Sequence, residues 1–129
     1  MKKIGIFMML SFWASMAAAN STEDDATQSL EMWEPKEVRV DGDSLIIISK
    51  ERRITDQIYR AMIVSGLCMG TISRPSSLDG ISEIQVLNQF GRQGYVFEGG
   101  KGECEKINNM PANKTEMYVL GQTHMHTNQ

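Results

Sequence analysis

The spacing of hydrophobic residues changes several times along this chain, and its first segment predicts two neighbouring strands. Val38 and Val40 alternate with polar residues, and the pair Asp41-Gly42 that follows them is a turn signal. The run 45–48 is apolar throughout and rich in β-branched residues. A run this short, bounded by turn residues, is typical of a strand buried in a sheet.

A helical period replaces the strand pattern after these two runs. Thr55 can cap the N-terminus of a helix, and apolar residues then recur every three to four positions. They predict a stripe wide enough for a helix that lies on a sheet. Its residues are Ile54, Ile58, Tyr59, Met62, Ile63 and Leu67. Gly66 and Gly70 weaken the pattern, and Pro75 forbids its continuation. We therefore expect the helix to end near Cys68.

Two further runs predict a β-hairpin. Residues 81–90 contain alternating apolar and polar positions, and residues 95–97 form a second short run. Gly91 and Gly94 bound the four-residue connection between these runs, a length that is common in hairpins. A last apolar stretch, 117–120, predicts a short edge strand.

The predicted order of strand, helix and hairpin favours an α+β fold, in which one helix packs on a small, mainly antiparallel sheet. We assign this single domain to residues 33–121. Residues 20–32 are rich in Ser, Thr, Asp and Glu and offer little to bury, so we expect a disordered acidic lead-in. Residues 122–129 are expected to form a flexible tail.

The first 19 residues have the layout of a secretory signal peptide. Lys2 and Lys3 make a short positive start, residues 4–16 are mostly apolar, and residues 17–19 are alanines that suit a cleavage site. The apolar run is shorter than the roughly 20 residues of a membrane-spanning helix. We therefore predict cleavage after Ala19, no stable membrane insertion after it, and a periplasmic or secreted protein with a bacterial type of export signal.

The charge of the chain argues against nucleic acid as a partner. The 129 residues have a formal net charge of −3, and the leader contains two lysines and no acidic residue. Cleavage would therefore leave 11 basic residues against 16 acidic ones, a net charge of −5. A protein with this balance has no electrostatic attraction to nucleic acid or to anionic lipid.

Two cysteines, Cys68 and Cys104, remain after the predicted cleavage, and an oxidising compartment would join them in one disulfide. The alternative is a redox-active pair or a thiolate metal site. Redox centres of the thioredoxin type place two cysteines close together at the start of a helix, whereas these two are far apart in the sequence. We therefore expect a structural disulfide that joins the end of the helix to the end of the hairpin.

The tip of the predicted hairpin is the candidate surface for a partner. Phe90, Arg92, Gln93 and Tyr95 lie within or beside the connection. Arginine and aromatic residues contribute most to the binding energy of protein interfaces. The alternative is that the aromatic rings pack into the core and that Arg92 is only solvated. An open edge of the sheet is a further place where a partner's strand could bind.

His124, Met125 and His126 are the candidate metal ligands. Imidazole and thioether groups suit copper, and imidazole also suits zinc. Because side chains alternate in direction along an extended chain, we expect both imidazoles to reach one ion only if the tail bends. The alternative is a polar tail that binds no metal.

The residue pattern contains no recognisable catalytic set. Both histidines lie in the expected tail, neither a Gly-x-Ser-x-Gly nor a Ser-x-x-Lys motif occurs, and the expected fold places no carboxylate pair in a cleft. We therefore expect a non-enzymatic protein without a cofactor. It would bind another extracytoplasmic protein, as an accessory subunit or an inhibitor. The alternative function is a periplasmic copper or zinc carrier that uses the His-Met-His segment.

Overall fold

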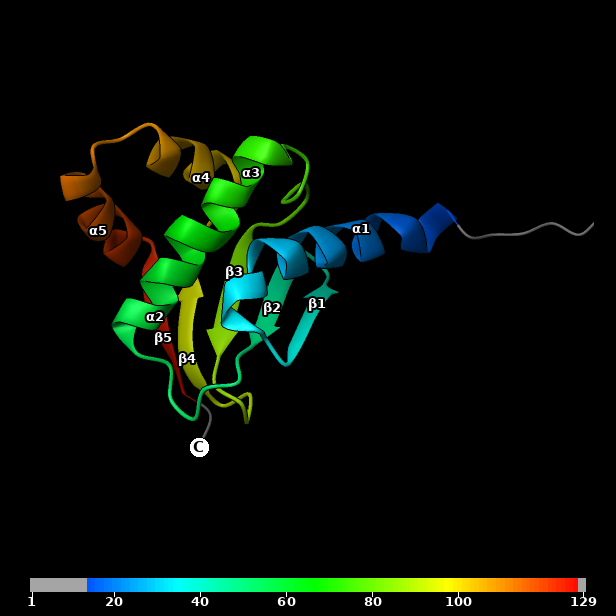
Figure 1. Ribbon diagram of the computed structural model, residues 1–129, viewed down its shortest axis with the longest axis horizontal. Coiled ribbons are helices and arrows are strands. Elements are labelled where there is room, and N and C mark those ends of the chain that lie inside the picture. Colours follow the sequence, from blue (N-terminus) through cyan, green and yellow to red (C-terminus); the bar gives the residue numbers. More distant parts are fainter. Residues whose placement is uncertain (1–13, 128–129) are drawn as a thin grey trace, which may run out of the picture.

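A five-stranded sheet in the order β1-β2-β3-β4-β5 forms the centre of the computed structural model (Figure 1), which describes residues 14–127 and their side chains from residue 21 onward. β2 and β3 pair in parallel, and the other three pairings are antiparallel. The predicted α+β class with a mainly antiparallel sheet is therefore confirmed. The strands are β1 (Glu37–Asp41), β2 (Ser44–Ile48), β3 (Glu83–Leu87), β4 (Gln93–Phe97) and β5 (Thr123–Thr127).

One long helical segment connects the parallel strands β2 and β3 and lies against the sheet (Figure 1). The backbone N–H of Ile58 donates a hydrogen bond to Oγ1 of Thr55, which confirms Thr55 as the N-cap. The segment continues past Cys68, where we expected it to end. Its parts are α2 (Asp56–Ala61), the π-helical stretch η2 (Met62–Cys68) and α3 (Met69–Ser73).

Two helical elements replace the disordered lead-in that we expected over residues 20–32. They are α1 (Ala14–Ser29) and the short 3-10 helix η1 (Glu31–Trp33). Ala26 and Leu30 are four positions apart, which places them on one side of the chain, and both are fully buried in the core. The lead-in prediction was wrong because these few apolar residues are sufficient to dock an otherwise polar helix.

Gly66 and Gly70 allow α1 to approach the long helical segment, and they do not end that segment. A Cβ atom on Gly66 would lie 2.8 Å from Cδ2 of Leu30, and a Cβ atom on Gly70 would overlap the side chain of Ser29. The two glycines are four positions apart and so form a groove along one side of the helix. The end of α1 packs in this groove.

Two more helices follow the hairpin, so the expectation of one helix is incomplete. α4 (Lys101–Asn108) occupies the expected loop after β4, and Glu103 accepts a hydrogen bond from the N–H of Gly100 at its start (2.8 Å). α5 (Ala112–Gly121) begins after Pro111 and contains the segment 117–120. We expected a strand there, because an apolar run this short does not discriminate a strand from a helix.

The expected flexible tail contains the last strand of the sheet. β5 pairs with β4 in antiparallel register, with Thr123 opposite Phe97 and Thr127 opposite Gln93. The tail prediction is therefore wrong for residues 123–127. Edge strands are bound through main-chain hydrogen bonds, so a polar sequence without an apolar period can still form one.

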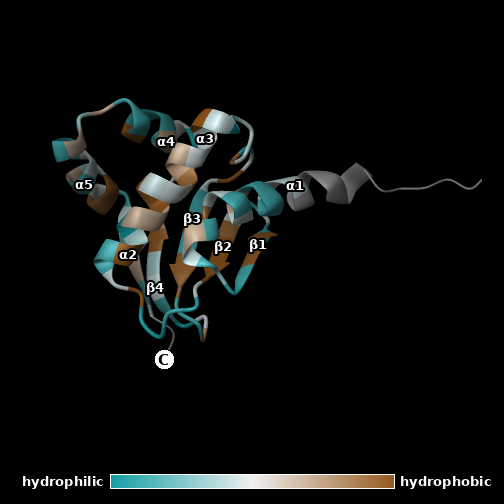
Figure 2. Ribbon diagram, viewed as in Figure 1, coloured by the Kyte–Doolittle hydropathy of each residue, from teal (hydrophilic) through white to brown (hydrophobic). Residues whose placement is uncertain are grey.

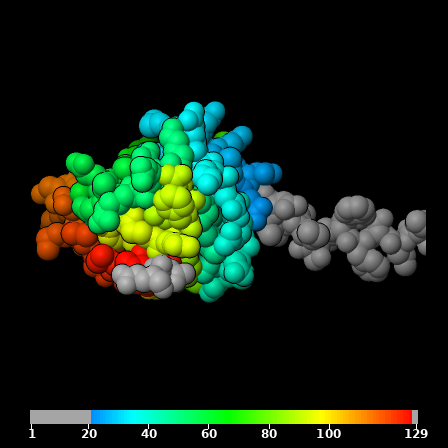
Figure 3. All heavy atoms as spheres, turned by 90° about the horizontal axis from the view of Figure 1, so that it is seen from below, coloured from blue at the N-terminus to red at the C-terminus, as the bar shows by residue number. Residues whose placement is uncertain are grey.

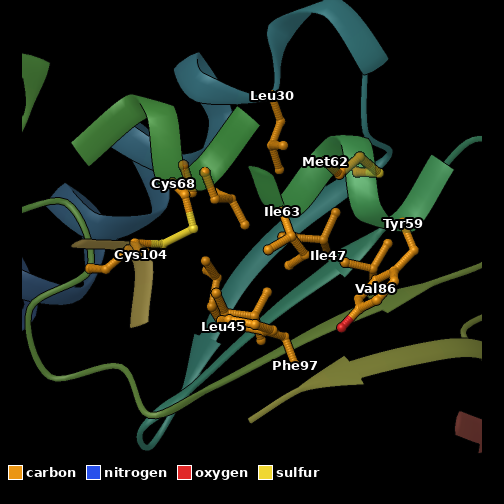
Figure 4. Packing of buried hydrophobic residues seen from close by; sticks show 14 of the residues in the cluster. Leu30, Leu45, Ile47, Tyr59, Met62, Ile63, Cys68, Val86, Phe97 and Cys104 are labelled. Carbon is orange, nitrogen blue, oxygen red and sulfur yellow. A yellow bond between two sulfur atoms is a disulfide. The ribbon is translucent and has the colours of Figure 1, made fainter. Parts of the chain in front are cut away.

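The helices cover one face of the sheet and bury the main core (Figure 4). Buried side chains of α1, α2, η2, α4 and α5 all belong to this cluster. The strands contribute Leu45, Ile47, Ile84, Val86 and Phe97 to it. A second cluster, Ile46, Ile48 and Leu87, contains strand residues only and lies on the opposite face. β2 and β3 are accordingly among the most hydrophobic elements in Figure 2.

Residues 1–13 of the expected leader lie outside the described residues. Residues 128–129 at the other end of the chain are not described either. α1 starts at Ala14 and passes without interruption through the predicted cleavage point after Ala19. None of the helices in the described part of the chain is both long and apolar enough to cross a membrane.

Candidate functional site

The sheet face opposite the helices is the candidate binding surface. Its apolar centre consists of Ile46, Ile48 and Leu87, which point away from the helices. Glu37 and Arg39 of the edge strand β1 lie opposite Ile48 and Ile46, and their side chains form an ion pair at 2.6 Å. We refer to this surface as the open face.

A hollow of about 400 Å³ lies at one end of the open face, beside the connection between β3 and β4. Ile48 and Leu87 contribute apolar side chains to it, and Phe90 lines it while 62% of that residue remains exposed. Lys36, Glu37 and Arg39 bring charges of both signs to the same hollow, and Arg39 is paired with Glu37. In Figure 3 the yellow segment, which includes the end of this connection, lies on the outer surface of the molecule.

Asn88 fixes the shape of the β3–β4 connection. Its side chain is buried, and its Oδ1 atom accepts hydrogen bonds from the backbone N–H groups of Arg92 (2.9 Å) and Gln93 (3.2 Å). Its Nδ2 atom donates to the carbonyl oxygen of Arg52 at 3.0 Å. A buried amide with this many partners holds the exposed Phe90 in a defined position. Sequence reasoning missed Asn88, because an asparagine in a turn is unremarkable without its partners.

The side chains of Gln93 and Tyr95 contact other residues of the protein and contribute little to its exposed surface. The amide of Gln93 accepts from the N–H of Ile54 (2.8 Å) and donates to its carbonyl oxygen (2.9 Å). The ring of Tyr95 stacks on that of Tyr59, with centroids 4.9 Å apart. Of the four residues expected to contact a partner, Phe90 and Arg92 therefore remain the candidates, and Tyr95 follows the core-packing alternative.

Tyr59 connects the helix layer to β5 by a chain of hydrogen bonds. Its hydroxyl lies 2.6 Å from Oγ1 of Thr123, which itself donates to the carbonyl oxygen of Val119 at 2.5 Å. The Tyr59 hydroxyl is therefore the donor to Thr123. Burial raises the pKa of Tyr59 well above its ordinary value, because the ionised phenolate would lose its water.

The strand β5 places His124 and His126 on the same face of the sheet. They lie opposite Val96 and Gly94, and residues two apart in a strand share a side. Our expectation that the chain must bend to bring the imidazoles together was therefore wrong. Nδ1 of His124 lies 2.6 Å from Oε2 of Glu98, and Met125 points to the helix side with 67% of its surface exposed.

The described residues of one copy do not form a complete metal site. Within residues 14–127, no three His, Cys, Asp or Glu side chains lie close enough together to hold an ion. Two imidazoles on one strand face provide half of the four ligands that zinc usually takes in proteins. The predicted ligands His124 and His126 thus share one face of the sheet, and Met125 lies on the other.

Cys68 and Cys104 form the expected disulfide, with their Sγ atoms 2.08 Å apart. Figure 4 shows the bond between the long helical segment and α4. Both residues are fully buried, and the carbonyl oxygen of Cys68 accepts a hydrogen bond from Nδ2 of Asn108 (2.9 Å). A bond enclosed in this way supports the structural role over the redox alternative.

Comparison with known proteins identifies no relative: no protein-family model, no curated protein and no solved structure matches this chain.

Proposed function

We propose that this protein is an exported, non-enzymatic module that binds another extracytoplasmic protein through the β3–β4 connection and the adjoining hollow of the open face. The observation that carries this proposal is Phe90, a large apolar side chain that is mostly exposed on a connection fixed by the buried Asn88. Exposed aromatic residues on ordered loops are typical anchors of protein interfaces. Arg92 and Arg39 would add polar contacts around this anchor.

The ionisable groups with a shifted pKa lie away from the hollow beside Phe90. Catalytic sites usually place groups with shifted pKa values in a cleft. The groups with a clear shift among the described residues are Glu34, Lys50, Tyr59 and Arg60. None of these lines the hollow beside Phe90, and Tyr59 is buried in the core.

The disulfide supports the exported location. Disulfides form and persist in oxidising compartments and are rare in the bacterial cytosol. The buried Cys68–Cys104 bond is therefore in keeping with the secretory signal that we predict for residues 1–19.

The proposed interface can be tested by exchanging one exposed apolar residue for serine. Phe90→Ser should remove saturable, stoichiometric binding of a partner captured from a periplasmic extract, because the anchor of the interface is lost. Ile72→Ser is the matched control, since Ile72 is a similarly exposed apolar residue on α3 and far from the hollow in the fold. Binding should be measured by co-purification followed by titration calorimetry with the isolated partner.

The expected loss for Phe90→Ser is at least about tenfold in affinity, which corresponds to the lower range for a dominant interface residue. Arg92→Ala should cause a smaller loss in the same direction. Equal binding by Phe90→Ser and Ile72→Ser would show that this surface is not the interface. Circular dichroism and thermal unfolding should confirm that both variants remain folded.

A further inference from the structure

The two edge strands of the sheet, β1 and β5, differ in how well they are protected against pairing with another strand. β1 carries three charged residues in five positions, and its Val40 N–H donates to the carboxylate of Glu23 from α1 (2.9 Å). β5, the other edge, contains no Lys, Arg, Asp, Glu or Pro. Proteins commonly use charged residues, prolines and covering elements to prevent sheet edges from pairing. β5 therefore has the character of an edge that accepts another strand.

The register of β5 defines which of its backbone groups are free to pair. The N–H of Glu98 donates to the carbonyl oxygen of Gln122 directly opposite it. Hydrogen-bonded and non-hydrogen-bonded positions alternate along an antiparallel pair, so His124 and His126 direct their main-chain groups toward β4. The main-chain N–H and C=O groups of the other three residues, Thr123, Met125 and Thr127, consequently point away from the sheet.

The sequence of β5 is a palindrome, Thr-His-Met-His-Thr over residues 123–127. A two-fold axis reverses the strand direction, so two copies of this strand can pair antiparallel with Met125 opposite Met125 of the second copy. Thr123 then lies opposite Thr127, and threonine pairs across strands are favourable. These are the three positions whose main-chain groups are free to pair. The same patch meets itself, as two-fold symmetric interfaces require.

This register also brings four imidazoles together. His124 of each copy would lie opposite His126 of the other, at non-hydrogen-bonded positions where opposing Cα atoms are only about 4.5 Å apart. His124 and His126 are separated by two residues, or about 6.8 Å along the strand. All four side chains point to the open face, because the axis is perpendicular to the sheet. Their imidazoles can therefore meet above the axis.

His124 also contacts a carboxylate, that of Glu98. Nδ1 of His124 lies 2.6 Å from Oε2 of Glu98, so one ring nitrogen is turned toward a carboxylate. Metal-binding histidines commonly donate their other ring N–H to a carboxylate, which orients the ring and increases its basicity. Glu98 would then be a positioning residue for a ligand.

We propose that two copies of this protein pair through β5 in a register centred on Met125, and that the resulting set of two His124 and two His126 side chains binds one divalent transition metal ion, such as Zn²⁺. The described residues of a single chain bring two of these four ligands to the site, so the set of four requires the second copy. Four imidazoles in a compact arrangement suit zinc or copper(II). This inference is independent of the partner surface around Phe90.

Sedimentation equilibrium of the exported protein, with and without Zn²⁺, tests the proposal directly. A five-residue edge buries little surface and should associate weakly by itself. Zinc should lower the dissociation constant of the dimer at least about tenfold, because it binds only the paired form. The measured mass should double, and one zinc ion should be bound per pair of chains. His126→Asn should abolish this response to zinc.

A cysteine variant tests the register separately from the metal. Met125→Cys should form a disulfide between two copies, because hydrogen-bonded positions on paired strands are about 5.5 Å apart at Cα, within the range of disulfides. Met117→Cys is the matched control, since Met117 is also an exposed methionine and lies on α5. Non-reducing electrophoresis should show a dimer for Met125→Cys in clear excess over Met117→Cys.

Two results would overturn this proposal. One is zinc binding with one ion per chain and an unchanged mass, which would mean that a single copy forms the site. The other is the absence of any zinc-dependent association, together with equal cross-linking of Met125→Cys and Met117→Cys. Phe90→Ser should leave the zinc response intact, and His126→Asn should leave partner binding intact, so the two proposals can fail separately.

Discussion

At the scale of single residues, Gly70 and Gly102 show that glycine has two different roles in this protein. Gly70 lies where α1 crosses the long helical segment, and a Cβ atom there would overlap Ser29. Gly102 lies in α4, and a Cβ atom there would have no neighbour within 4 Å. The first glycine is required by close packing, and the second has no packing reason that the described atoms show.

We predict opposite effects of alanine at these two positions. Gly70→Ala should lower the free energy of unfolding by about 1–3 kcal/mol, because α1 must move to make room for the methyl group. Gly102→Ala should raise it by up to about 1 kcal/mol, because alanine favours the helix. Urea unfolding of both variants gives the comparison. Equal effects of the two changes would contradict the packing of α1 against the long segment.

The raised pKa of Tyr59 predicts a loss of stability in alkali. The folded state keeps the phenol neutral, whereas the unfolded chain ionises near the ordinary value of about 10. The stabilisation is therefore complete below pH of about 10 and decreases as the pH rises above it. Tyr59→Phe should show a shallower decrease over this range, and should be about 1 kcal/mol less stable at neutral pH through the lost hydrogen bond to Thr123. Urea unfolding at a series of pH values measures both.

Several residue roles followed from the sequence and others required the fold. Thr55 and the two cysteines were predicted correctly, because a helix cap depends on local chemistry and two cysteines allow only one pairing. The role of Gln93 depends on the backbone of Ile54, which is distant in the sequence. No local pattern reveals such a contact, and Gln93 was therefore assigned to the partner surface.

At the scale of elements, strands and helices were predicted best where their hydrophobic period was strong. β1, the long helical segment and the β3–β4 hairpin have such a period, and β2 is a continuous apolar run. α1 and β5 do not, because each is held by a few contacts at its ends or edges. α1 is docked by Ala26 and Leu30 through a groove of glycines, and β5 is bound through its main chain. These interactions do not produce a regular hydrophobic pattern.

The Cys68–Cys104 disulfide links two elements that hydrophobic contacts alone would hold less firmly. It joins the end of η2 to α4, and closes a loop with a sequence separation of 36 residues. Replacing both cysteines by alanine should lower the free energy of unfolding by about 3–4 kcal/mol, because the unfolded chain regains the freedom of this loop. Thermal unfolding measures the loss. Thiol labelling of the denatured, unreduced protein should find no free cysteine.

At the scale of the whole molecule, the two candidate surfaces lie on separate parts of one sheet. The hollow beside Phe90 is lined by residues of β1, β2, β3 and the β3–β4 connection, whereas the palindromic strand β5 forms the opposite edge from β1. A protein arranged in this way could pair with a second copy at β5 and keep both hollows free for a partner. The dimer would then present two equivalent binding sites, which strengthens binding to a partner that is itself repeated.

The last prediction concerns export, because the proposed function requires that the protein lie outside the cytoplasm. We expect cleavage after Ala19, so that the exported chain begins at Asn20. The cut would fall inside α1, but the contacts described for this helix involve Glu23, Asp25 and Ala26, which all follow it. The shortened helix should therefore remain docked on β1 and α3.

N-terminal sequencing of the protein recovered from a periplasmic fraction tests this cleavage. Ala19→Leu should block it, because the processing site requires a small side chain at this position, and the uncut chain should stay with the membrane fraction. Thr22→Leu, just beyond the cut, is the control. Ala26→Leu would not serve, because Ala26 is buried and the change would disturb the core. A mature protein that still begins at Met1 would contradict the export signal, and with it the compartment in which the disulfide is expected to form.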